Sequence, residues 1–212
     1  MLMERRTAFR CLKYSERGFS MIELAIALTI ILIVTAAAIV QLQATLQQSK
    51  ANAALQTTLG QLRRAQEMAI DQRRVYRVTF TAPRTIQLDQ VNIDPVTLAK
   101  TFVFQSQIDL PIETQFTVVS GIPTSSTTVP DGYGSGSVAI DFDRDFGGGG
   151  TEVYFQRDGR SLDSANRLNN GVIYMCRPGD LMSCKAVSLI GATGRAKGWR
   201  LTTTSTGTRW SQ

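Results

Sequence analysis

The stretch that decides the fold is GFSMIELAIALTIILIVTAAAIV, residues 18–40. A helix over residues 19–40 would be about 33 Å long, enough to cross the hydrocarbon core of a membrane. Glu23 is the single charged residue in it. A carboxylate carried into the bilayer core costs about 2.5–3.5 kcal/mol, so we expect a partner on another copy of the helix. The alternative is a capping box, in which Ser20 and Glu23 satisfy free backbone donors at the helix start.

The sequence before this stretch is basic, with five Arg or Lys residues against two Glu in residues 1–18. The positive-inside rule keeps such a flank in the cytoplasm and places the remainder of the chain on the other side. The apolar run is longer than the core of a secretory signal peptide, and no Ala-x-Ala cleavage pattern follows it. The sequence therefore predicts a single-pass membrane anchor.

Residues 18–28, GFSMIELAIAL, resemble the processing site of type IV pilins and type II secretion pseudopilins. That pattern is Gly, Phe, Ser or Thr, two apolar residues, Glu and a further apolar residue. The resemblance implies cleavage after Gly18 by a prepilin peptidase, methylation of the new amino terminus at Phe19, and pairing of Glu23 with the terminal amine of a neighbouring subunit. It also implies a leader over residues 1–18, which removes Cys11, and a bacterial inner-membrane protein that is incorporated into a filament.

Helical spacing continues after the apolar run. Residues 41–73 contain no proline and carry an apolar stripe at Leu55, Leu59, Leu62 and Ala69, interrupted by the polar Gln66. We therefore expect one helix over residues 19–73, with a transmembrane half (19–40) and an amphipathic half (41–73) that packs on a domain.

Residues 75–212 show the alternating, β-branched pattern of short strands bounded by Gly, Pro, Asn or Asp. The expected strands are 75–81, 85–91, 101–108, 114–120, 137–143, 151–156, 171–176 and 185–191. These predict two packed antiparallel sheets in a periplasmic β domain, and hence an α+β fold class.

The order of a long helix and an all-β domain resembles the GspH/FimT group of minor pseudopilins and minor pilins. The resemblance rests on Asp158-Gly159 after an aromatic strand, on the strand that begins at Gly171, and on the Gly194-Arg195 turn. It implies a structural and assembly subunit of a type II secretion pseudopilus or a type IV pilus, whose partners are other pilins or pseudopilins.

Cys176 and Cys184 flank a Pro-Gly-Asp turn signal, so their sulfur atoms can meet across a hairpin. In an oxidising periplasm we expect a disulfide, worth about 2–3 kcal/mol on the loop-entropy argument. A redox role is disfavoured because the spacing is not Cys-x-x-Cys.

Two surface sites are weaker candidates. Asp141, Asp143, Asp145 and Glu152 have the spacing of an EF-hand calcium loop, but Phe146 stands where glycine is needed, and a Gly-rich hairpin is the favoured alternative. The candidate DNA-binding residues are Arg195, Lys197, Trp199 and Arg200. Cations beside aromatic rings suit phosphates and bases, and in the FimT branch a Gly-Arg-x-Arg-like segment is associated with DNA capture. Here Lys197 replaces the last arginine, and an exposed, solvated turn is the alternative.

Nothing in the sequence indicates an enzyme or a cofactor. The chain has no histidine, which removes the commonest general base and transition-metal ligand. Nucleophile-elbow, phosphate-loop and metal-type cysteine patterns are also missing from the sequence. The balance of 23 Lys or Arg against 17 Asp or Glu is too even to indicate a nucleic-acid partner by itself. We therefore predict an assembly protein, with a DNA-binding minor pilin as the alternative.

Overall fold

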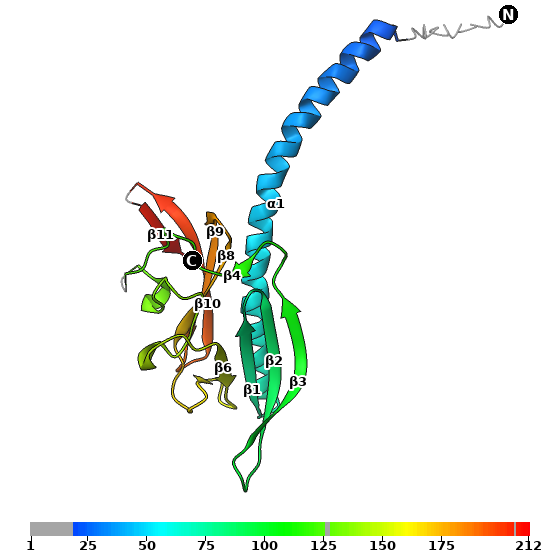
Figure 1. Cartoon of the computed structure of the whole chain (residues 1–212). Coiled ribbons are helices and arrows are strands. Elements are labelled where there is room, and N and C mark those ends of the chain that lie inside the picture. The colour runs from blue at the N-terminus through cyan, green and yellow to red at the C-terminus, as the bar shows by residue number, and fades with distance from the viewer. Residues whose placement is uncertain (1–18, 126–127, 206) are drawn as a thin grey trace, which may run out of the picture. The chain divides into compact units, whose positions relative to one another are not determined.

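The computed structural model describes residues 19–125, 128–205 and 207–212 (Figure 1). A single long helix, α1 (Met21–Asp71), agrees with the helix expected from the sequence. The chain divides into two compact units, with the boundary after Gln43 inside this helix.

The first unit contains the apolar half of α1. Met21–Ile39 is long and apolar enough to cross a membrane, with a mean hydropathy of 2.6 and no part of it buried. The hydroxyl groups of its two threonines form hydrogen bonds within the helix: Thr29 donates to the carbonyl oxygen of Ile26 (2.8 Å) and Thr35 to that of Ile31 (2.7 Å). Polar groups bonded within the helix are what an apolar environment requires.

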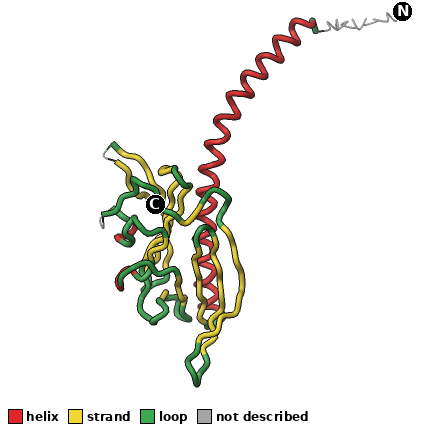
Figure 2. Tube along the Cα trace, viewed as in Figure 1, coloured by secondary structure: helices red, strands yellow, loops and turns green. Residues whose placement is uncertain are grey.

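The second unit holds two antiparallel sheets, drawn in yellow in Figure 2, as expected. The five-stranded sheet has the order β3 (Lys100–Asp109), β2 (Thr85–Ile93), β1 (Val75–Thr81), β6 (Glu152–Phe155) and β7 (Ser161–Leu162). The six-stranded sheet has the order β11 (Gly207–Ser211), β10 (Arg195–Thr204), β9 (Asp180–Ile190), β8 (Gly171–Arg177) and β4 (Gln115–Phe116), and β5 (Ile140–Asp141) also pairs with β8. Two 3₁₀ turns, η1 (Pro130–Gly132) and η2 (Arg144–Phe146), lie in the connections.

The amphipathic half of α1 and both sheets form one hydrophobic core. The predicted stripe is buried, at 3% exposure for Leu55, 6% for Leu59 and 1% for Leu62. The same cluster includes Val78 of β1 and Val187 of β9. Residues 44–71 therefore belong to the same compact unit as the strands, and the β strands depend on this part of the helix for their core.

Strand lengths differ from the sequence prediction in the middle and at the end of the domain. The strands expected at 114–120 and 137–143 shrink to the two-residue β4 and β5. Strands β7, β10 and β11 were not expected. In β10 the apolar alternation is hidden by its basic residues and by Gly198, which lies so close to the helix that a Cβ atom there would sit 3.0 Å from a methyl group of Leu59.

Candidate functional sites

The start of α1 is the candidate assembly segment. Phe19 is 82% exposed, and the backbone N–H of Leu24 donates to the carbonyl oxygen of Ser20 at 3.1 Å as the helix begins. Within the described residues neither Ser20 nor Glu23 makes a side-chain hydrogen bond, so the capping box that the sequence allowed is not formed. The Glu23 carboxylate is exposed and available to a group outside this chain. Gly18, Cys11 and the rest of the leader lie outside the described residues.

The predicted disulfide between Cys176 of β8 and Cys184 of β9 is confirmed. Both cysteines are fully buried in a second hydrophobic cluster with Tyr174. The tight turn between the strands is closed by Ser183, whose hydroxyl accepts from the backbone N–H of Arg177 (2.9 Å) and donates to the backbone carbonyl of Asp180 (2.6 Å). The bond is enclosed by packing and therefore serves the structure of the hairpin.

The four residues with calcium-loop spacing do not come together. Asp141 accepts the backbone N–H groups of Ser135 and Gly149, each at 2.9 Å. Asp145 accepts from Asn170, and Glu152 accepts from Arg77 and Tyr154. No group of three or more metal-ligating side chains occurs in the part of the chain that the structure describes. The antiparallel bridge between Phe142 and Gly150 instead matches the Gly-rich hairpin.

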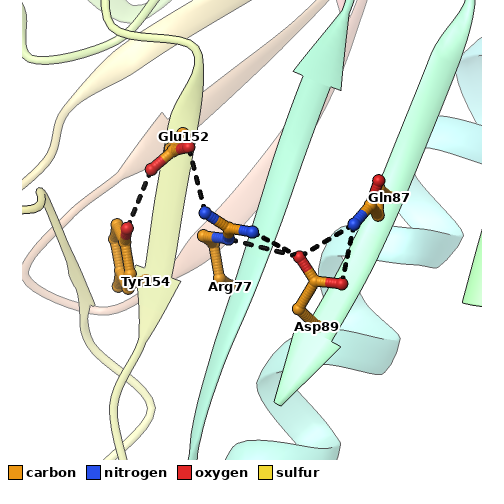
Figure 3. Close-up of polar contacts among 5 residues, drawn as sticks. All are labelled: Arg77, Gln87, Asp89, Glu152 and Tyr154. Atoms are coloured by element: carbon orange, nitrogen blue, oxygen red, sulfur yellow. Dashed lines mark hydrogen bonds and ion pairs between the residues drawn. The ribbon is translucent and has the colours of Figure 1, made fainter. Parts of the chain in front are cut away.

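A polar network that the sequence analysis missed lies on three neighbouring strands of the five-stranded sheet (Figure 3). Arg77 of β1 donates to Asp89 of β2 at 2.6 Å and to Glu152 of β6 at 3.2 Å. Gln87 also donates to Asp89 (2.8 Å), and Tyr154 donates to Glu152 (2.8 Å). A charged residue amid the apolar residues of VYRVTFT, with an opposite charge in TIQLDQV, was the available signal.

Each charged group of this network has a hydrogen-bond or ion-pair partner within the network. Burial lowers the pKa of Arg77, but its bonds to Asp89 and Glu152 outweigh that effect and leave the pKa raised. Burial, followed by the hydrogen bond to Glu152, raises the pKa of Tyr154 to about 12. The guanidinium is also covered by the ring of Phe102, 3.5 Å from its centroid. Since every charge has its partner, the network fixes strand positions and offers no free acid or base for chemistry.

The edge of the same sheet exposes apolar side chains. Strand β3 pairs with β2 on one side and forms the edge of the sheet on the other. Phe102, Val103 and Phe104 in it are 43%, 44% and 60% exposed. A long apolar edge strand without proline is prone to pair with another chain. This edge is therefore a candidate contact surface for other proteins.

The candidate DNA-binding residues are divided between the two faces of β10. Lys197 and Trp199 lie on one face, where Lys197 pairs with Asp131 at 2.7 Å and the indole N–H of Trp199 donates to Ser188 at 2.9 Å. Arg195 shares that face by alternation along the strand, and it is exposed. Arg200 alternates to the face that carries Gly198 and contacts the helix. DNA binding stays a prediction, and salt-sensitive retardation of duplex DNA tests it.

Residues 13–39 match the family described as the prokaryotic N-terminal methylation motif. No curated protein matches the sequence significantly.

Two solved structures are similar. They are the type IV minor pilin FimU of Pseudomonas aeruginosa and the minor pseudopilin EpsH from the type 2 secretion system of Vibrio cholerae. FimU is 11% identical with a TM-score of 0.41, and the match covers 73% of this chain and 89% of FimU. EpsH is 13% identical with a TM-score of 0.34, and the match covers 76% of this chain and 96% of EpsH.

Proposed function

We propose that this chain, whose amino-terminal region is type IV pilin-like, is a minor pilin or pseudopilin of the GspH/FimT kind. Its role is that of a structural and assembly subunit of a type II secretion pseudopilus or a type IV pilus. The observation that carries the proposal is the methylation motif at residues 13–39, which contains an exposed Glu23 without a partner among the described residues. Prepilin peptidase cleaves after Gly18, and the new amino terminus at Phe19 is methylated.

The mechanism follows from the surface of the first half of α1. In the inner membrane its apolar side chains contact lipid, and the basic flank keeps the leader in the cytoplasm while the β domain is periplasmic. On assembly, helix–helix contacts replace lipid contacts. Glu23 then pairs with the terminal amine of a neighbouring subunit, because an unpaired carboxylate among apolar helices is costly. The charge pair therefore selects one register between neighbouring helices.

The test is Glu23→Gln in cells that assemble the filament. We expect membrane insertion and cleavage after Gly18 to continue, and incorporation into filaments to be lost. Glu67→Gln removes an exposed carboxylate from the other half of the same helix and is the matched control. Normal incorporation of the Glu23 variant would contradict the pairing mechanism, whereas failure of cleavage in the unmodified chain would contradict the assignment to the pilin-like class.

A further inference from the structure

We propose that the groove between the start of the second unit's helix and strands β9 and β10 binds one anionic oxygen group, a carboxylate or a phosphate. Two adjoining cavities of about 170 and 220 Å³ lie there. Both are lined by Gln48 of the helix and by Met182 and Lys185 of β9, and the second is also lined by Asn52 and Arg200. All these residues belong to the second compact unit.

Two cations face each other in this groove. Lys185 of β9 is directly opposite Arg200 of β10 in the strand register. Like charges in that position destabilise a sheet unless a counter-charge lies between them. The side chains share the second cavity, so an anion placed there would contact both.

Lys185 is also short of a partner. It is 8% exposed, and no hydrogen bond or ion pair joins its ammonium group to any residue in the described part of the chain. Burial and then the charge of Arg200 lower the pKa of Lys185. Burying most of a lysine residue while its charge has no acceptor in the chain is costly, and an anionic ligand would supply the acceptor.

No acidic side chain forms an ion pair with Lys185 in the described part of the chain. Asp180 lines the first cavity, where its charge partly offsets the lowering of the Lys185 pKa, but its hydrogen bond is to the backbone N–H of Met182 (3.1 Å). Glu113 forms ion pairs with Lys50 at 2.8 Å and with Arg177, the last residue of β8, at 4.0 Å. The second cavity, which Asp180 does not line, therefore offers an ammonium, a guanidinium and two side-chain amides, from Gln48 and Asn52, as donors. Such a set suits a carboxylate or phosphate, which a guanidinium binds through two parallel hydrogen bonds.

The experiment uses the full chain in non-ionic detergent and titrates inorganic phosphate or acetate against chloride at constant ionic strength. Isothermal titration calorimetry should show saturable binding of at least one of the two anions. Lys185→Met and Arg200→Gln should each weaken it by about tenfold or more, as expected for a hydrogen bond to a charged group. Arg64→Gln, which removes an exposed cation from the same helix, should leave binding unchanged.

The outcomes separate the two ligand groups. Tighter binding of phosphate assigns the site to a phosphate group, and tighter binding of acetate assigns it to a carboxylate, such as an acidic side chain of another protein. Absence of saturable binding by both anions overturns the proposal, as does an equal response of the unmodified chain, Lys185→Met and Arg64→Gln. If circular dichroism shows that Lys185→Met does not fold, the exposed Arg200→Gln variant decides the question alone.

Discussion

The two halves of α1 are the same secondary structure with opposite surfaces. Leu28 in the first half is 51% exposed, whereas Leu62 in the second half is 1% exposed. Apart from Glu23, the first half is apolar all round, as a helix that contacts lipid or other helices must be, and the second half has a single apolar stripe that packs on one core. The apolar surface of the first half is therefore exposed and needs partners from outside the chain, whereas that of the second half is buried within the chain.

The largest expected effect comes from the same substitution made in each half. Leu62→Ala opens a cavity in the core of the second unit and should lower its free energy of unfolding by about 2–5 kcal/mol. Leu28→Ala should leave that unfolding unchanged, because Leu28 contributes nothing to this core. Chemical denaturation followed by tryptophan fluorescence measures both, since Trp199 and Trp210 lie in the second unit. Equal effects of the two variants would contradict the difference in burial between the two halves of α1.

The disulfide lies in the second unit, which buries its apolar residues within the chain. Replacing Cys176 and Cys184 together by serine should lower the free energy of unfolding of the second unit by about 2–3 kcal/mol. Membrane insertion of the first half of α1 should be unaffected. Thermal unfolding with and without a reducing agent gives the measurement. If the reductant had no effect on the unmodified chain, a contribution of the bond to stability would be refuted.

Gln66, the polar residue in the apolar stripe, connects the helix to one turn from each sheet. Its side-chain amide donates to the backbone carbonyls of Gly159 and Thr193, both at 2.9 Å. Gln66→Ala should therefore cost about 1 kcal/mol, because water can replace the lost hydrogen bond at the exposed Thr193 but less readily at the buried Gly159. Glu67→Ala, next to it on the exposed face, is the control and should change stability by less than about 0.5 kcal/mol. A loss no larger than that of the control would show that the bridge is unimportant.

Sequence periodicity predicted those parts of the molecule where apolar residues recur at a regular spacing. The apolar run, the Leu stripe and the alternating strands such as 75–81 depend on burial along a single element, and burial leaves a pattern in sequence. Gln66 looked like an exception to its stripe, because its two acceptors come from turns more than ninety residues further along the chain. The same turns contain Gly159 and Gly194, which lie so close that a side chain at Gly194 would collide with the carbonyl of Gly159.

Candidate sites were less predictable because they depend on which face of a strand each residue occupies. Arg195, Lys197 and Arg200 are near neighbours in sequence, yet the odd spacing of Arg200 from the other two turns it to the helix side. There it lies opposite Lys185, a residue that no sequence pattern singled out. Glu152 likewise had a plausible calcium spacing, but its actual partner, Arg77, lies on another strand. The partners of these residues are set by the register between neighbouring strands, and the local sequence does not contain that register.

The smallest expected effect tests the ion pair that joins the second half of α1 to the β domain. Lys50 donates to Glu113 at 2.8 Å, and this hydrogen bond, followed by the charge of Lys50, lowers the pKa of Glu113. A lowered carboxyl pKa contributes stability above the unfolded-state value, and that stability is lost as the pH falls through the folded-state pKa. Because both side chains are about 40% exposed, water screens the pair and its contribution to stability is slight.

Lys50→Gln should therefore raise the pKa of Glu113 towards its ordinary value of 4.5 while leaving the unfolding midpoint at neutral pH nearly unchanged. Titration of the Glu113 carboxyl carbon by nuclear magnetic resonance measures the first quantity, and thermal unfolding measures the second. Arg64→Gln, which removes a cation that has no contact with Glu113, should change neither. An unaltered pKa in the Lys50 variant would mean that Arg177, 4.0 Å away, holds Glu113 by itself, and that Lys50 does not help to attach this half of the helix to the β domain.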